Sequence, residues 1–134
     1  MLRRLAILAC CITGVLGAGF SAAAEPTALD NRLNKLGYAR GEPLDRIHNY
    51  RVDGWNYLDD HHIMIYTGPS QRALITTQTA CRELGSAERI GFSTTASNLT
   101  KFDKIVVRGA GGILQQCQIQ QIHQLDSTKN KTSR

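Results

Sequence analysis

Short strand-like segments separated by turn residues recur about every ten residues and restrict the folds open to this chain. Apolar and polar residues alternate within them, as at His62–Thr67, where Ile63 and Ile65 share one face. The connections are too short for the crossovers that join parallel strands. We therefore predict a mainly β protein, either a small antiparallel β-barrel or a twisted, half-closed sheet of about six strands. The candidate strands are residues 47–52, 54–58, 62–67, 72–77, 89–93, 104–108 and 116–122.

One short helix is predicted ahead of the strands, from Thr27 to Leu36. Leu29, Leu33 and Leu36 follow the i, i+4, i+7 spacing that places side chains on one face of a helix. Thr27 can serve as the N-cap, and Gly37 can take the left-handed conformation that ends many helices.

The first 24 residues have the order of a cleavable signal peptide. Arg3 and Arg4 give a positive start, residues 5–20 carry no charge, and the small residues 21–24 follow. Cleavage near Ala24 would leave a mature chain that is periplasmic or secreted.

Two alternatives to cleavage at Ala24 remain open. The run Ile7-Leu8-Ala9-Cys10 resembles a lipobox, in which Cys10 would carry the lipid. Cleavage there would leave only five apolar residues after Arg4. A retained membrane anchor requires about 20 apolar residues, which is more than residues 5–20 supply.

The cysteines divide between the signal and the mature chain. Cys10 and Cys11 would leave with the signal, so Cys81 and Cys117 would remain as one pair in an oxidising compartment. A disulfide is the expected state of such a pair. A redox or metal-binding pair is the alternative, but the sequence has no Cys-x-x-Cys motif.

The length of the mature chain predicts a single β-rich domain over residues 25–125. Residues 126–134 are polar and are expected to form a disordered tail. Loss of Arg3 and Arg4 would lower the formal net charge from +5 to +3. The basic residues are scattered rather than clustered, which disfavours nucleic acid as a partner.

Several spaced features between residues 47 and 125 carry a family resemblance. They are Trp55, Leu58-Asp59, Cys81 with Leu84, Phe102-Asp103 and Cys117-x-Ile119. With them the chain resembles a family of small exported bacterial proteins classed as domain of unknown function 6491. The resemblance implies a periplasmic or surface location and a cysteine pair, but no activity. Residues 109–115 make the last hairpin longer than the family pattern.

The run Asp59-Asp60-His61-His62 is the most site-like cluster in the sequence. Carboxylate and imidazole groups are ligands of Zn²⁺, Ni²⁺ and Cu²⁺. Asp60 and His62 would share one face of a strand, and His48 or His123 would add a third ligand. The alternative is a polar turn that leads into a strand.

A second candidate site consists of Arg89, Lys104 and Arg108 on neighbouring predicted strands. With Arg82 and Lys101 they would form a basic face for anionic lipid headgroups or polysaccharide. The alternative is an ordinary solvated surface of the sheet.

Motifs of catalysis are missing from the sequence. Gly109-Ala110-Gly111-Gly112 lacks the Lys-Ser or Lys-Thr of a phosphate loop, and there is no Gly-x-Ser-x-Gly elbow. We therefore favour a non-enzymatic periplasmic binding or envelope-interaction domain that needs no cofactor. Its partner would be an envelope protein or an anionic envelope component. The alternative is a metal-binding protein or metal-dependent enzyme that uses the Asp59–His62 cluster.

Overall fold

The computed structural model describes residues 27–48, 50–94 and 96–129. The predicted signal peptide and the last five residues lie outside this part of the chain. Helix α1 (Ala28–Leu36) is followed by a strand-rich chain. Its elements are β1 (Tyr38–Leu44), β2 (Arg46–Ile47), β3 (Gly54–Asp59), β4 (His62–Tyr66), β5 (Arg72–Thr77), the 3-10 helix η1 (Arg82–Ser86), β6 (Arg89–Phe92), β7 (Leu99–Thr100), β8 (Lys104–Arg108), the 3-10 helix η2 (Ala110–Gly112) and β9 (Leu114–Ser127).

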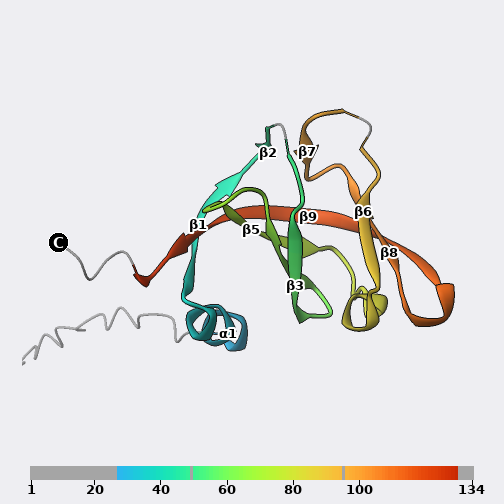
Figure 1. Ribbon diagram of the computed structural model, residues 1–134, viewed down its shortest axis with the longest axis horizontal. Helices are drawn as coiled ribbons and strands as arrows, with labels where there is room; N and C mark the ends of the chain where they lie inside the picture. Colours follow the sequence, from blue (N-terminus) through green and yellow to red (C-terminus); the bar gives the residue numbers. More distant parts are fainter. Residues whose placement is uncertain (1–26, 49, 95, 130–134) are drawn as a thin grey trace, which may run out of the picture.

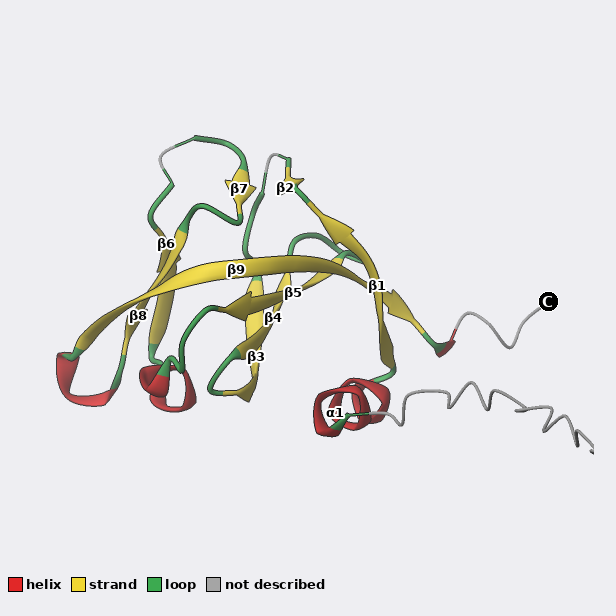
Figure 2. Cartoon of the chain, turned by 180° about the vertical axis from the view of Figure 1, so that it is seen from behind, coloured by secondary structure: helices red, strands yellow, loops and turns green. Residues whose placement is uncertain are grey.

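The main sheet is antiparallel and curled, with the order β3-β4-β5-β9-β8-β6, and β1 also pairs with β9. The short strands β2 and β7 form a separate ladder. Figures 1 and 2 show β9 running across the whole molecule, with the other strands arranged along it. Within the described residues, β3 and β6 end the sheet without pairing to each other. This confirms the mainly β class in its half-closed form, because the sheet curls without closing into a barrel.

The long strand β9 joins all parts of the sheet. Successive portions of it pair with β8, then β5, then β1. A register shift occurs where Thr76 pairs with Gln121 but Thr77 pairs with Ile119, which leaves an extra residue on β9. Such a bulge shifts the alternation of side chains between faces. As a result Ile119 and Ile122 contribute to one core and Leu125 to another.

Two apolar cores lie on opposite sides of this sheet. The larger core fills the inside of the curl and contains the buried residues Ile63, Ile65, Ala73, Ile75, Cys81, Leu84, Leu99, Ile105, Val107, Cys117, Ile119 and Ile122. The smaller core lies between the sheet and α1 and contains Leu29, Leu33, Leu58, Met64, Leu74 and Leu125. The helix thus covers the outer face of the sheet, where alternate side chains would otherwise be exposed.

The capping signals of α1 act as predicted. The Thr27 hydroxyl accepts a hydrogen bond from the amide of Asp30, and the Asp30 carboxylate accepts one from the amide of Thr27. Gly37 ends the helix with φ +86°, a left-handed conformation that favours glycine. Leu29 and Leu33 are buried, whereas Leu36 is exposed.

Two strand assignments from the sequence are wrong. Residues 38–44, for which the sequence predicts no strand, form β1 with a register irregularity between Arg40 and Pro43. A proline is tolerated in a strand at such an irregularity. Of the predicted strand 47–52, only Ile47 lies in a strand among the described residues, and the Tyr50 amide donates to the Ser97 carbonyl instead of to a ladder partner.

The end of β9 also differs from the predicted domain boundary. The strand extends to Ser127, past residue 125 and into the segment expected to be disordered. Pairing with β1 explains this extension, because Tyr38 and Ala39 lie opposite Ser127 and Asp126. Polar residues can remain in a strand here because their backbone N–H and C=O groups form hydrogen bonds with the neighbouring strand.

Candidate functional site

The disulfide forms between Cys81 and Cys117, with Cα atoms 5.9 Å apart. Both residues are buried in the larger core. Beside the disulfide, the Gln115 side-chain oxygen accepts a hydrogen bond from the amide of Glu83 at 3.0 Å. The covalent bond and this hydrogen bond hold η1 against the start of β9.

The Asp59–His62 cluster lies at the turn between β3 and β4. The His62 Nδ1 atom is 2.7 and 2.9 Å from the two carboxylate oxygens of Asp59. Asp60 instead accepts a hydrogen bond from the Tyr57 hydroxyl at 2.8 Å. The two predicted metal ligands, Asp60 and His62, therefore have different partners.

Asp59 acts in this turn as an ionised hydrogen-bond acceptor. Burial raises its pKa, but the amide of His61 and the ring of His62 favour the charged form, and the net result is a lowered pKa. The His61 amide lies 2.8 Å from the carboxylate, a turn-stabilising bond typical of aspartate. The contacts of Asp59 thus match the polar-turn alternative.

The two other histidines considered as metal ligands lie elsewhere. His123 is buried on β9, opposite Pro43 of β1 and Leu74 of β5, and the order of the sheet places it two strands from His62. Burial and the charge of Arg40 lower its pKa. His48 follows β2 and is exposed. In the described part of the chain, no three His, Cys, Asp or Glu side chains are grouped so that they could hold a metal ion.

Arg89, Lys104 and Arg108 lie on one face of the sheet. Arg89 of β6 and Arg108 of β8 are direct cross-strand partners. Lys104 shares their face, because the residues that alternate with Lys104 and Arg108 on β8 are buried in the core. Among residues 27–48, 50–94 and 96–129, no carboxylate forms a salt bridge with any of the three. Glu88 is a close neighbour, since its amide donates to the Arg108 carbonyl.

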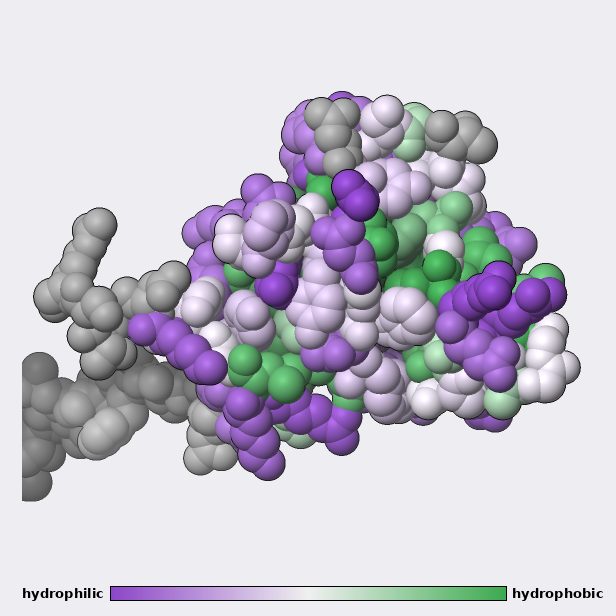
Figure 3. All heavy atoms as spheres, in the orientation of Figure 1, coloured by the Kyte–Doolittle hydropathy of each residue, from purple (hydrophilic) through white to green (hydrophobic). Residues whose placement is uncertain are grey.

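Two large apolar side chains are exposed next to these cations. Ile113 is 57% exposed and Leu114 is 64% exposed, and Leu114 lies directly opposite Arg108. Figure 3 shows hydrophilic and apolar side chains side by side at the right-hand end of the molecule, where β8 turns into β9. We call Arg89, Lys104, Arg108, Ile113 and Leu114 the hairpin face. The sequence places these two apolar residues in the extended hairpin of residues 109–115, and nothing in it indicates that they are exposed.

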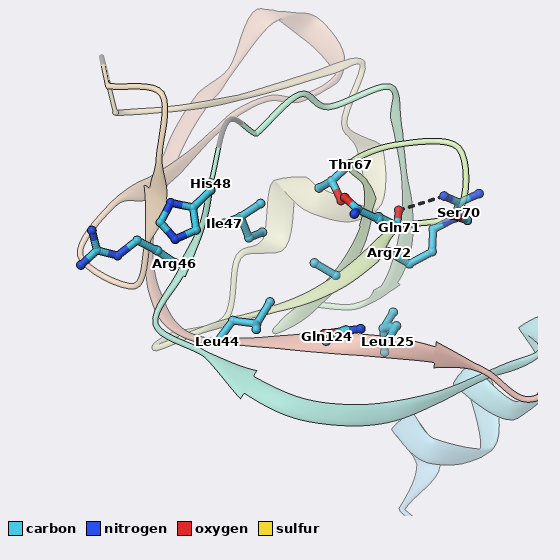
Figure 4. Close-up of a pocket in the computed structure, with 11 residues that line it drawn as sticks. Leu44, Arg46, Ile47, His48, Thr67, Ser70, Gln71, Arg72, Gln124 and Leu125 are labelled. Atoms are coloured by element: carbon cyan, nitrogen blue, oxygen red, sulfur yellow. Dashed lines mark hydrogen bonds between the residues drawn. The ribbon is translucent and has the colours of Figure 1, made fainter.

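A pocket of about 290 Å³ lies at a different place in the fold, between the β1–β2 segment and the β4–β5 turn. Figure 4 shows Leu44, Arg46, Ile47 and His48 on one side of it and Thr67, Ser70, Gln71 and Arg72 on the other, with Gln124 and Leu125 at its base. The sequence did not predict this pocket, because its walls come from three segments that only the folded sheet brings together.

The described residues contain no helix long and apolar enough to cross a membrane. Fold and surface together define a small disulfide-linked, half-closed β-sheet protein with a mixed basic and apolar face. The chain belongs to a family of unknown function, DUF6491, whose model matches residues 1–134. Neither a curated protein nor a solved structure matches the chain.

Proposed function

We propose that this protein is an exported, non-enzymatic binding domain that attaches to anionic phospholipid surfaces of the cell envelope through its hairpin face. The observation that carries the proposal is the direct pairing of Arg89 with Arg108 beside exposed Leu114. The export pattern of residues 1–24 supports a periplasmic or secreted location, where such surfaces are accessible.

The arginine pair favours an anionic ligand. Like charges directly opposite each other on neighbouring strands destabilise a sheet. Within the described residues, neither Arg89 nor Arg108 has a salt-bridge partner that would offset this repulsion. Phosphate headgroups would supply the missing negative charge, with about 1 kcal/mol of attraction for each cation near an anionic membrane.

The apolar members of the hairpin face favour a bilayer over a purely aqueous polyanion. Ile113 and Leu114 project beside the cations from the end of a hairpin. Removing one such side chain from water contributes up to about 1.5–3 kcal/mol. Cationic and apolar side chains together are the combination that binds membrane interfaces.

The metal-binding alternative has less support from the geometry. Asp59 and His62 contact each other, Asp60 contacts Tyr57, and Asp59 also accepts the His61 amide. Each of these contacts fits a turn-stabilising role, so the hairpin face is the better-supported site.

We expect the protein to co-sediment with vesicles that contain phosphatidylglycerol and to bind weakly to vesicles of phosphatidylcholine alone. The double variant Arg89→Gln/Arg108→Gln should lower the partition coefficient about 30-fold, because it removes two contributions of about 1 kcal/mol each. The variant Ile113→Ser/Leu114→Ser should also weaken binding. Higher ionic strength should weaken the binding of the wild type, because salt screens exposed charges.

The matched control is Arg32→Gln/Lys35→Gln on α1. Both residues are exposed, and the substitution removes the same charge from a different face. If the control lost as much binding as the hairpin-face variant, net charge rather than this face would be responsible. Equal binding of the wild type to both kinds of vesicle would also contradict the proposal.

A further inference from the structure

We propose that acidification releases helix α1 and strand β1 from the sheet, because protonation of His123 puts a buried positive charge beside Arg40. This conformational switch is separate from the hairpin face and does not depend on it. Figures 1 and 2 show α1 and β1 together at one end of the molecule, with β6, β8 and the β8–β9 hairpin at the other end. Release would expose the apolar residues of the smaller core and leave the larger core in place.

His123 lies on the face of the sheet that α1 covers. It is directly opposite Leu74 of β5, and residues opposite each other on neighbouring strands share a face. Leu74 belongs to the smaller core, and so does Leu125, two residues further along β9. On its other side, His123 pairs with Pro43 of β1. The imidazole therefore lies where β1 meets the smaller core.

The surroundings of the His123 ring favour its neutral form. The residue is 8% exposed, and its Nδ1 atom is buried without a hydrogen-bond partner among the described residues. A neutral imidazole needs only one N–H group, which the other ring nitrogen can carry. A protonated imidazole carries N–H groups on both nitrogens, so the Nδ1–H group would be buried without an acceptor, which is costly.

The charges around His123 also oppose its protonation. Burial, and after it the positive charge of Arg40 on β1, lower the pKa of His123. Alternation along β5 makes Arg72 a second cation on this face of the sheet. The carboxylate of Asp30 on α1 pairs with Arg40 at 3.5 Å, and Glu42 of β1 is exposed. Within the described part of the chain, no carboxylate forms a salt bridge with His123.

Few contacts hold α1 and β1 on the sheet. In the described residues, β1 pairs with β9 alone, and its register is irregular between Arg40 and Pro43. Helix α1 is held by the smaller core and by the pair of Asp30 with Arg40. The larger core and the disulfide lie on the other side of the sheet. Opening at this end therefore costs less than unfolding the whole domain.

The direction of the pH effect follows from the two states of His123. Release exposes the ring to solvent and restores a pKa of about 6.5, whereas the pKa is lower in the closed state. The released state binds the proton more tightly, so its population rises as the pH falls below about 6.5, by up to about tenfold at pH 5.5. Asp30 and Asp59 have lowered pKa values, so their contributions are lost only below about pH 4.

Amide hydrogen exchange measured by NMR at pH 7.5 and 5.5 tests this switch, with rates expressed as protection factors that correct for the intrinsic effect of pH. Acidification should lower the protection of α1 and β1 in the wild type about three- to tenfold. The protection of β8 and of the first residues of β9 should stay unchanged. In His123→Gln the protection of α1 should not depend on pH over this range. His123→Phe, which keeps an uncharged ring, gives the same test if glutamine destabilises the sheet.

His48→Gln is the matched control, because it makes the same change at an exposed histidine that follows β2. It should keep the pH response of the wild type. The proposal is overturned if the protection of α1 in the wild type does not change with pH, or if both His123 variants keep the wild-type response. An equal loss of protection in β8 and α1 would also overturn it, because acid would then loosen the whole domain.

Discussion

Replacing both Cys81 and Cys117 with alanine is expected to lower the free energy of unfolding by about 4 kcal/mol. The disulfide closes a loop of sequence separation 36, and the chain-entropy account assigns roughly this value to a loop of that length. Both sulfur atoms also fill space in the larger core. A loss of this size is a large part of the roughly 5–15 kcal/mol by which small domains are stable.

Urea denaturation followed by the fluorescence of Trp55 measures this loss. The wild type in the presence of a reductant should approach the stability of the double variant, and the double variant should not respond to the reductant. Intact-mass analysis with alkylation should label these two thiols only after reduction. Two freely alkylated thiols in the native protein would contradict the disulfide.

Leu33→Ala is expected to destabilise the protein by about 2–5 kcal/mol. Leu33 is fully buried between α1 and the sheet, within the core that contains Leu58, Met64, Leu74 and Leu125. Truncation removes apolar contacts and leaves a cavity that the sheet cannot fill completely. Urea denaturation monitored by circular dichroism gives the free-energy difference.

Leu36→Ala is the matched control because it makes the same change on the same helix. Leu36 is 42% exposed and lies outside both buried clusters, so its truncation should cost less than about 1 kcal/mol. Similar losses in the two variants would contradict this account, because alanine is the better helix former and only the packing of Leu33 against the sheet should make the two sites differ.

Local sequence signals predicted much of the fold. The Thr27 cap, Gly37 and the leucine spacing define α1, and alternation of apolar residues defines the β4–β5 hairpin. Strand β1 could not be predicted in this way, because Gly41 and Pro43 disfavour a strand and pairing with β9 overrides that preference. The bulge in β9 could not be predicted either, because it depends on the register in which β9 pairs with β5.

The candidate sites were predictable only in part. The sequence predicts that Arg89, Lys104 and Arg108 lie on neighbouring strands and share a face. It does not predict the register between those strands, so the direct pairing of Arg89 with Arg108 is seen only in the structure. Strand alternation predicted that Asp60 and His62 would act together, but the two side chains have different partners. A register shift between Tyr57 and Asp59 and the turn hydrogen bonds of Asp59 determine their contacts.

The most direct test of the proposed envelope binding is to map the contact surface by NMR. Adding bicelles that contain phosphatidylglycerol to the ¹⁵N-labelled protein should shift or broaden amide signals of residues 89–92 and 104–116, while those of α1 stay unchanged. Bicelles of phosphatidylcholine alone should have little effect. Perturbations confined to α1 or spread evenly over the protein, or no perturbation by anionic bicelles, would contradict binding through the hairpin face.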